Sequence, residues 1–473
     1  MGDRQKSFRT LSTDSEQILL VDKNLLGKEE FIMPIYEEKN FSEFQHRRQK
    51  LLDFVKSSYL DTKIGGILLF ANFEHDRVRF RQDSTFYYFT GIEEPGAALW
   101  IDLSGQSILY LPDYKGGRDR WIAANDDLNQ GNAERFGFDK IDFLGKPCVG
   151  YTCYSFFGSD EYAYLLEKIV SVVRQDGTIF TCAPKALGAY QDQRLILDSL
   201  NSVARSSAKF PIDLLINSVD ISSFVAHMRR KKDKNEIELM YKAVELTMLG
   251  HSAAASLIAP GVNEYQVQAG LEFIFTSEGG SCAFPTIIAS GKNSTILHYT
   301  LNNRELKKGD LVLVDIGAEY NYYCGDLSRT YPVSGEFSKD QAKLYQLVLD
   351  AQEYIAEIAK PGMWLNNSSH PEKSLHHIAK KYFDDHGDYG QFFYHGIGHF
   401  LGLDVHDVGD ILQPLAEGDV FTIEPGLYLS DKNMGVRIED NYLMMHDGVV
   451  CLSEELPKQI DEIVEIVGQL LDE

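Results

Sequence analysis

LVLVDIG, residues 311–317, is typical of a buried strand, and it carries the carboxylate of Asp315 in its middle. A second strand is predicted over residues 322–331, and it contains Asp326. If the turn between them centres on residues 320–321, the two carboxylates face each other with Cβ atoms about 5 Å apart. Like charges at that separation destabilise a hairpin unless a cation lies between them. The stretch therefore predicts a hairpin that binds metal.

The same arrangement occurs again nearer the C-terminus. VFTIEPG (420–426) is apolar up to Glu424, and GVRIED (435–440) returns with Glu439. A turn centred on residues 431–432 places the two glutamates opposite each other. One acidic residue in a strand is more often an edge or bulge residue, but two hairpins of this kind favour a ligand set. They also suggest an internal duplication of two similar halves.

Between the hairpins lies YHGIGHFLGLDVHD, residues 394–407, which holds three of the thirteen histidines. Its glycines argue against a helix, so this is not the helical HExxH zinc motif. No phosphate-binding context follows that would support dinucleotide binding. We therefore take His395, His399 and His406 as candidate site residues.

Two other histidine positions receive different interpretations. His298 falls in STILHY (294–299), which we expect to be an apolar strand, and it is a fourth candidate. His376 and His377 fall in a Lys-rich helical stretch and are expected to be solvated.

Four carboxylates with one or more histidines form an oxygen-rich site. Their charge of about −4 balances two divalent cations, and such ligation favours Mn²⁺, with Co²⁺ or Zn²⁺ able to substitute. Two metals about 3.5–4 Å apart can share a water, lower its pKa and so yield a hydroxide nucleophile. Nearby histidines can donate hydrogen bonds to the developing oxyanion. The set predicts hydrolysis of an amide or ester, and no GxSxG elbow, P-loop or Cys-His signature competes with it.

The rest of the chain divides into three parts. Residues 1–40 are polar without a clear period and are interpreted as an N-terminal extension. A helix is predicted over 43–57 and a buried strand over 65–70, and helices and strands alternate to about residue 217, as in an α/β domain. A second, α+β unit follows, with capping-box spacing at DKNE (233–236) and SKDQ (338–341) before two helices.

Composition excludes several classes of function. The net charge of −24 over 473 residues argues against a nucleic-acid partner, and the short basic run RRKK (229–232) is expected to be a solvated helix start. Six cysteines without a CxxC pair are expected to be reduced and mostly buried. Neither a signal-peptide core nor an apolar stretch of membrane-spanning length is found, so we expect no membrane partner and a cytoplasmic location.

The second half resembles the pita-bread metallopeptidases, which include methionine aminopeptidase, Xaa-Pro aminopeptidase (aminopeptidase P) and prolidase. The family's ligand contexts are present in order as VDIG, GDLSRT, HGIGH, TIEPG and VRIED. The first half, with RR (47–48), FRQDSTFYYFTG (80–91) and EPG (94–96), resembles the N-terminal domain of aminopeptidase P and prolidase, which methionine aminopeptidases lack. The resemblance implies an α/β N-terminal domain over 41–220 and an α+β pita-bread catalytic domain over 221–473.

The resemblance also implies a role for each residue. The implied metal ligands are Asp315, Asp326, His399, Glu424 and Glu439, with Asp326 and Glu439 bridging two metals. Asp315 would also meet the substrate amino terminus, and Glu424 would shuttle a proton to the leaving amine. The implied substrate-binding groups are His298, His395 and His406. Arg437 shares strand parity with Glu439, so it either pairs with a ligand carboxylate or fixes the substrate end. Trp121 is a candidate for an aromatic residue that a neighbouring subunit inserts into the site.

The implied activity is hydrolysis of the N-terminal Xaa-Pro bond of peptides by a homo-oligomer, either a dimer or a tetramer. A prolidase, which acts on Xaa-Pro dipeptides, is the main alternative. No arginine lies between Asp407 and Glu424, where some prolidases read the dipeptide carboxylate, and the loop from Glu424 to Glu439 is short. These departures favour longer peptides. A non-catalytic pita-bread binding module and a metal-free hydrolase of the creatinase kind are disfavoured, because the ligand set is complete.

Overall fold

The computed structural model describes residues 9–13, 16–20, 39–75, 77–115, 117–118, 121, 127–148, 150, 157–183 and 190–469. The chain forms two compact units, residues 1–38 and 39–473. In the first, β1 (Arg9–Thr13) pairs antiparallel with β2 (Glu16–Leu20). The sequence did not predict this hairpin, because residues 1–40 have no clear period.

The second unit begins with a mixed six-stranded sheet in the order β6-β5-β4-β3-β7-β8. Its strands are β3 (Gly65–Phe70), β4 (Ala98–Asp102), β5 (Ser107–Leu111), β6 (Lys140–Phe143), β7 (Thr178–Thr181) and β8 (Ser218–Asp220). Strands β3, β4 and β5 form an antiparallel meander, whereas β6, β7 and β8 join by parallel pairing. The predicted strand over 65–70 is confirmed, and it is buried along its whole length.

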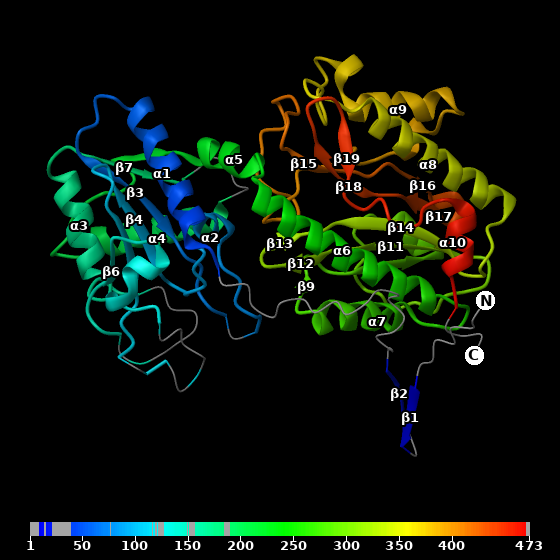
Figure 1. Cartoon of the computed structure of the whole chain (residues 1–473), viewed down its shortest axis with the longest axis horizontal. Coiled ribbons are helices and arrows are strands. Elements are labelled where there is room, and N and C mark those ends of the chain that lie inside the picture. The colour runs from blue at the N-terminus through cyan, green and yellow to red at the C-terminus, as the bar shows by residue number, and fades with distance from the viewer. Residues whose placement is uncertain are drawn as a thin grey trace. The chain divides into compact units, whose positions relative to one another are not determined.

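Helices cover both faces of this sheet (Figure 1). They are α1 (Phe41–Ser58), α2 (Ser84–Thr90), α3 (Ala163–Val173), α4 (Gln191–Ser206) and α5 (Ser222–Arg230), and η2 (Gln130–Phe136) is a 3₁₀ segment. Ile67 and Leu69 point to the cluster that includes α1, and Leu68 and Phe70 to the cluster that includes α3 and α4. The predicted helix over 43–57 is confirmed as α1, which begins after Asn40, whose side chain accepts from Ser42 N–H.

The following part contains α6 (Lys234–Leu257), α7 (Glu264–Ser277), α8 (Lys339–Ile358), α9 (Leu375–Asp385) and α10 (Ile460–Ile466). Its strands are β9 (Ser281–Cys282), β10 (Ile287–Ser290), β11 (Leu311–Ile316), β12 (Ala318–Tyr320), β13 (Tyr323–Cys324), β14 (Leu327–Pro332), β15 (Val420–Ile423), β16 (Gly426–Leu429), β17 (Met434–Arg437), β18 (Asp440–Met444) and β19 (Val449–Cys451). Short 3₁₀ segments are η3 (Gly291–Thr295), η4 (Pro371–Lys373), η5 (Tyr389–Phe392) and η6 (Ser430–Lys432). Both predicted capping boxes are present, at the starts of α6 and α8.

The first carboxylate hairpin forms with a register that differs from the predicted one. Strand β11 pairs with β14, and Asp315 lies opposite Ser328 rather than opposite Asp326. The turn is at Asn321 and Tyr322, whose φ values of 47° and 73° are those of a two-residue hairpin turn. The predicted centre was therefore one residue too early, which shifted the pairing by two residues. Because strand side chains alternate, a shift of two leaves both carboxylates on the same face.

The second carboxylate hairpin has the predicted register. Gly426 pairs with Arg437 in β16–β17, and Ile423 pairs with Asp440 in β15–β18. One register thus runs through both strand pairs, and Glu424 and Glu439 lie opposite each other where the ladder is interrupted. The site carboxylates therefore stand where the regular ladder stops.

The two hairpins meet through an antiparallel bridge between Ser328 and Glu439, in which Glu439 N–H donates to the Ser328 carbonyl at 3.0 Å. Helix α6 packs along β11 and β14, and α8 packs against β15, β16 and β17 (Figure 1). Each hairpin thus has its own covering helix, and the seam between the hairpins brings the four acidic residues together.

Three residues of the basic run 229–232, Arg229, Arg230 and Lys232, are buried and only Lys231 is exposed, so the prediction of a solvated helix start is wrong. Arg229 donates to Asp407 at 2.5 Å and Lys232 to the other oxygen of Asp407 at 2.9 Å, while Arg230 pairs with Asp419. Burial of these cations is tolerated because each has an anionic partner.

Two other expectations concern the whole chain. The described cysteines are all free, as predicted, but Cys282 is exposed and Cys148 and Cys451 are half-buried, so the expectation of mostly buried thiols is wrong. Across the described residues, the structure contains no helix that combines the length and apolar character needed to span a bilayer.

Candidate metal centre and active site

The histidine segment runs as an extra strand beside β15. Thr422 N–H donates to the His399 carbonyl at 2.9 Å, and Glu424 N–H donates to the Ile397 carbonyl at 2.8 Å. A Cβ on Gly398 would lie 1.9 Å from the Thr422 carbonyl oxygen, so only glycine permits this approach. The expectation that the segment is not helical is confirmed, and the close pairing fixes His399 near the two hairpins.

Three of the predicted ligands come together tightly. Ligand atoms of Asp326, His399 and Glu439 all lie within 4.8 Å of one another. His399 Nε2 is 3.4 Å from Asp326 Oδ2, 3.7 Å from Glu424 Oε1 and 4.0 Å from Glu439 Oε1. One imidazole nitrogen therefore faces three carboxylates that come from both hairpins.

A backbone hydrogen bond orients the His399 ring. His399 Nδ1 is 3.1 Å from the Phe400 carbonyl, which can only accept, so Nδ1 carries the proton. In the neutral ring the lone pair of Nε2 then points at the carboxylates, as a metal-ligating histidine requires.

Crowding of the carboxylates raises their pKa values. Burial raises the pKa of Asp326, Glu424 and Glu439, and their mutual repulsion and the charge of Asp315 raise it further. Burial lowers the pKa of His399, but hydrogen bonding to Asp326 and the charges of Asp326 and Glu424 outweigh burial and raise it. Bound cations would relieve this repulsion between the carboxylates.

Asp315 has one carboxylate oxygen without a partner among the described residues. Its Oδ2 accepts from Arg437 Nη2 at 2.5 Å, whereas its Oδ1 is buried and unbonded among the described residues. An unsatisfied buried carboxylate oxygen is costly unless a cation or another donor meets it. Asp315 therefore fits a ligand role, and Arg437 has the pairing role expected for it.

Arg437 also belongs to a chain of hydrogen bonds that was not predicted from the sequence. Its Nη1 donates to the Tyr428 hydroxyl at 2.9 Å, and that hydroxyl is 2.8 Å from His395 Nε2. His395 Nδ1–H donates to the Gly396 carbonyl at 2.8 Å, so Nε2 accepts from Tyr428. Burial and the charge of Arg437 lower the pKa of His395 to about 3, which keeps the ring neutral. Strand parity could have revealed Tyr428, which is four residues beyond Glu424 on the same face.

The remaining histidines lie at the edge of the site. The His406 ring is 4.1 Å from that of His399. His298 is exposed, and it lies in a turn after η3 rather than on the predicted strand. A charge on His298 would lower the pKa of both His395 and His406, so these three imidazoles share one neighbourhood. The prediction that His376 is solvated is wrong, since its half-buried ring packs 5.2 Å from Phe393.

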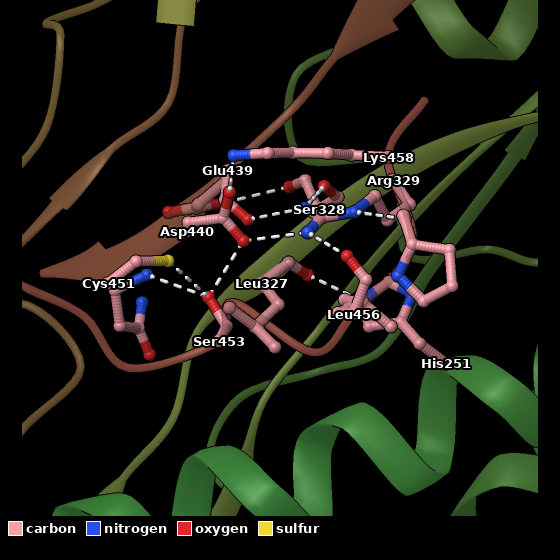
Figure 2. A network of polar contacts seen from close by, with 12 residues as sticks. His251, Leu327, Ser328, Arg329, Glu439, Asp440, Cys451, Ser453, Leu456 and Lys458 are labelled. Atoms are coloured by element: carbon pink, nitrogen blue, oxygen red, sulfur yellow. Dashed lines mark hydrogen bonds and ion pairs between the residues drawn. The ribbon is translucent and has the colours of Figure 1, made fainter. Parts of the chain in front are cut away.

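A fully buried ion pair supports Glu439 from behind (Figure 2). Arg329 Nη1 donates to the carbonyls of Ser328 and Glu439 at 3.0 and 2.8 Å, and Nη2 donates to Asp440 Oδ1 at 2.7 Å. Ser328 Oγ donates to Glu439 Oε2 at 2.8 Å. Asn441 holds Asp326 in a similar way, since its Oδ1 accepts from Asp326 N–H at 3.1 Å. These supporting residues were not predicted from the sequence, although each lies within three positions of a predicted ligand.

Taken with the donor types, these contacts fit a two-metal centre. The residues that would hold the ions are Asp315, Asp326, His399, Glu424 and Glu439. Oxygen donors dominate, the Nε2 of one histidine faces them, and Asp315 has a buried oxygen that no described residue meets. The site is that of a hydrolytic metalloenzyme.

The chain belongs to metallopeptidase family M24, whose model matches residues 238–446. The aminopeptidase P N-terminal domain model matches residues 44–146. Membership makes the chain a metal-dependent hydrolase with divalent metal ions as cofactors, and it confirms the resemblance and the two-part fold class.

Individual relatives match over nearly the whole chain. The Xaa-Pro aminopeptidase of Haemophilus influenzae is 33% identical, and the match covers 90% of this chain and 97% of the relative. The structure of an Escherichia coli aminopeptidase P variant in complex with substrate is similar at a TM-score of 0.75 and 28% identity, covering 92% of this chain and 100% of that one. The Xaa-Pro dipeptidase of Pyrococcus furiosus is 38% identical, but it matches only 50% of this chain and 66% of its own length.

Proposed function

We propose that this protein is a dinuclear-metal aminopeptidase that hydrolyses the bond between the first residue of a peptide and a proline at the second position. The observation that carries the proposal is the convergence of Asp326, His399 and Glu439 within 4.8 Å of one another, with Glu424 beside them. The similarity to Xaa-Pro aminopeptidases over 90% of the chain, N-terminal domain included, favours this activity over that of a dipeptidase.

Metal ions bound by the five predicted ligands would supply an activated water and polarise the scissile carbonyl. The oxygen-rich set favours Mn²⁺, and Co²⁺ or Zn²⁺ can substitute. Burial raises the pKa of Glu424, which suits a carboxylate that takes a proton from the attacking water and gives it to the proline nitrogen. An imide nitrogen leaves only after it is protonated, so this transfer is required for turnover.

The other polar groups bind and orient the substrate. Arg437 holds one oxygen of Asp315, which leaves that carboxylate oriented toward the substrate α-ammonium group. His298, His395 and His406 lie around the metal ligands and would contact the substrate carbonyls and the proline ring. Because His395 is fixed by Tyr428 and Gly396, it presents a set orientation before substrate arrives.

The direct test is hydrolysis of Ala-Pro and of Ala-Pro-Ala by the full chain, with added Mn²⁺ and with chelator. We expect release of alanine from the tripeptide, lost with chelator and restored by Mn²⁺. Cleavage of the dipeptide alone would make the protein a prolidase. Failure to cleave either peptide while metal is bound would contradict the proposal and favour a binding role.

Expectations about domain boundaries, oligomeric state and location belong with this proposal. We place the domains at 41–220 and 221–473 after an extension over 1–40, and we expect a homo-oligomer, a dimer or tetramer, in the cytoplasm. Trp121 is 74% exposed, as a residue that enters a neighbouring subunit's site would be in a single chain. The oligomeric state of the wild type and of Trp121→Ala is measured by light scattering, and kcat/KM is measured for both. A wild type that is active as a monomer would contradict the expectation that Trp121 enters a neighbouring subunit's site.

A further inference from the structure

A hollow of about 820 Å³ opens beside His298, on the loop between η3 and β11. Ile296 and Leu301, which are 52% and 73% exposed, contribute apolar surface to it. Its charged side chains are Lys292, Arg304 and Lys307, and none of the described residues that line it is acidic. The hollow is therefore cationic in a chain whose net charge is −24.

Two of the three cations form no ion pair with any residue that the structure describes. Arg304 pairs with Asp310 at 2.7 Å. For Lys292 and Lys307 the described part of the chain contains no ion pair, and Lys292 and Lys307 are both exposed. Two uncompensated positive charges at one hollow favour an anionic ligand.

Several lining residues of the hollow are held in place by Glu264, which is buried and is not itself part of the lining. This buried carboxylate accepts from Ser290 Oγ at 2.6 Å, Asn293 Nδ2 at 3.2 Å, Tyr299 OH at 2.8 Å and Arg304 N–H at 2.9 Å. Four points of the surrounding chain are thus tied to one side chain. A surface fixed in this way loses little entropy when a peptide binds to it.

The direction of the substrate decides what can occupy the hollow. An Xaa-Pro aminopeptidase has a single residue before the scissile bond, so only the part after that bond can extend along the surface. The hollow lies next to the site, because Tyr299, which lines it together with His298, belongs to the same buried apolar cluster as Tyr428, the hydrogen-bond partner of His395. A hollow of about 820 Å³ is within the range of small-ligand sites and holds more than one residue.

We propose that this hollow binds the residues that follow proline, and that Lys292 and Lys307 make the enzyme prefer acidic side chains there. The inference rests on the proposed function and specifies its substrate class. Without these lysines the net charge of −24 on the chain would disfavour an acidic peptide. The lysines therefore extend the substrate range toward peptides of the type Xaa-Pro-Glu-Glu.

The test compares three C-terminally amidated peptides, Ala-Pro-Ala-Ala, Ala-Pro-Glu-Glu and Ala-Pro-Lys-Lys, with the full Mn²⁺-loaded protein. Exposed ion pairs predict a kcat/KM ratio of glutamate over lysine peptide of about five-fold or more at low salt. The ratio is expected to fall toward one in about 0.5 M NaCl, because salt screens exposed charges.

The variant Lys292→Glu/Lys307→Glu should bring the ratio below one. The matched control is Lys360→Glu/Lys373→Glu, which makes the same charge change at exposed lysines of a separate hollow between α8 and α9. The control should leave the ratio unchanged. Equal cleavage of all three peptides by the wild type, or a ratio that survives in the first variant, would overturn this inference alone. If none of the peptides is cleaved, the proposed function fails and this inference fails with it.

Discussion

The substitution Asp440→Asn probes how far the metal centre depends on the ion pair behind it. Asp440 is fully buried, and its two oxygens accept from Arg329, Ser453, Gln352 and Lys458 at 2.7, 2.7, 2.7 and 3.1 Å. An asparagine offers one acceptor oxygen instead of two, so its NH₂ group must face at least one of these donors. It also leaves the buried guanidinium of Arg329 without an anion.

Removing one partner of a buried ion pair costs about 3–5 kcal/mol. For the proposed catalytic domain over 221–473, of about 250 residues, each kcal/mol lowers Tm by roughly 2–4 °C, so we expect a fall of roughly 6–20 °C. The charge of Arg329 holds the Asp440 pKa well below its ordinary range against the effect of burial. A depressed folded-state pKa contributes stability above about pH 4, and this contribution is lost as the pH falls further. The difference between the two proteins should therefore narrow in acid.

The assay is thermal unfolding followed by circular dichroism, with Asp385→Asn as the control. Asp385 pairs with Lys381 at 2.5 Å, but both side chains are more than half exposed, at 58% and 72%. Such a pair contributes about 0.5 kcal/mol, so the control should change Tm by less than about 2 °C. If Asp440→Asn shifted Tm no more than this control, the buried pair would not be a principal support of the site.

Three further predictions follow from other contacts. Glu424→Gln should lower kcat by about 10²–10⁴ without loss of fold, as measured by peptide hydrolysis and circular dichroism, and near-normal turnover would refute the proton-transfer role. Gly398→Ala should lower both Tm and activity because its Cβ would lie 1.9 Å from the Thr422 carbonyl, whereas Gly396→Ala, whose nearest atom is 3.8 Å away, should be close to neutral; equal effects would contradict the close approach. Burial raises the pKa of Asp83 to about 6, so the contribution of this group to stability is present below about pH 4 and lost as the pH rises through 6. At pH 7 Asp83→Asn should therefore be more stable than the wild type by up to about 3 kcal/mol, measured by urea unfolding. A difference in unfolding free energy between the two proteins that is the same at pH 4 and pH 7 would refute this.

Local patterns in the sequence predicted much of the fold and the candidate site. Capping boxes, the buried strands at 65–70 and 311–316 and the 431–432 turn are short-range signals that formed where they were expected. The strand expected over 294–299 is instead a 3₁₀ segment followed by a turn. The turn at 321–322 was predicted one residue too early, because its left-handed residues are Asn321 and Tyr322 and tyrosine rarely adopts such a conformation. The candidate ligands survived this error, since the shift preserved the face of the strand.

Local sequence patterns could not predict contacts between residues that are far apart in the chain. The basic run 229–232 looked solvated because the partner of Lys232, Asp407, lies 175 residues further along the chain. Tyr428 and Arg329 act on the site through contacts that only the packed hairpins create. The ordered ligand motifs still named residues that the structure brings together, among them Asp326, His399 and Glu439.

The seam at Ser328 and Glu439 has a consequence for folding. Each hairpin by itself brings only two of the four acidic residues, and about 110 residues separate the two sides of the bridge. A divalent cation held by acidic residues of both hairpins would act as a removable cross-link between two halves that are otherwise joined only through a long stretch of chain. Amide hydrogens at the seam, such as those of Glu439 and Arg437, should then exchange with solvent earliest when metal is withdrawn, before the outer helices loosen.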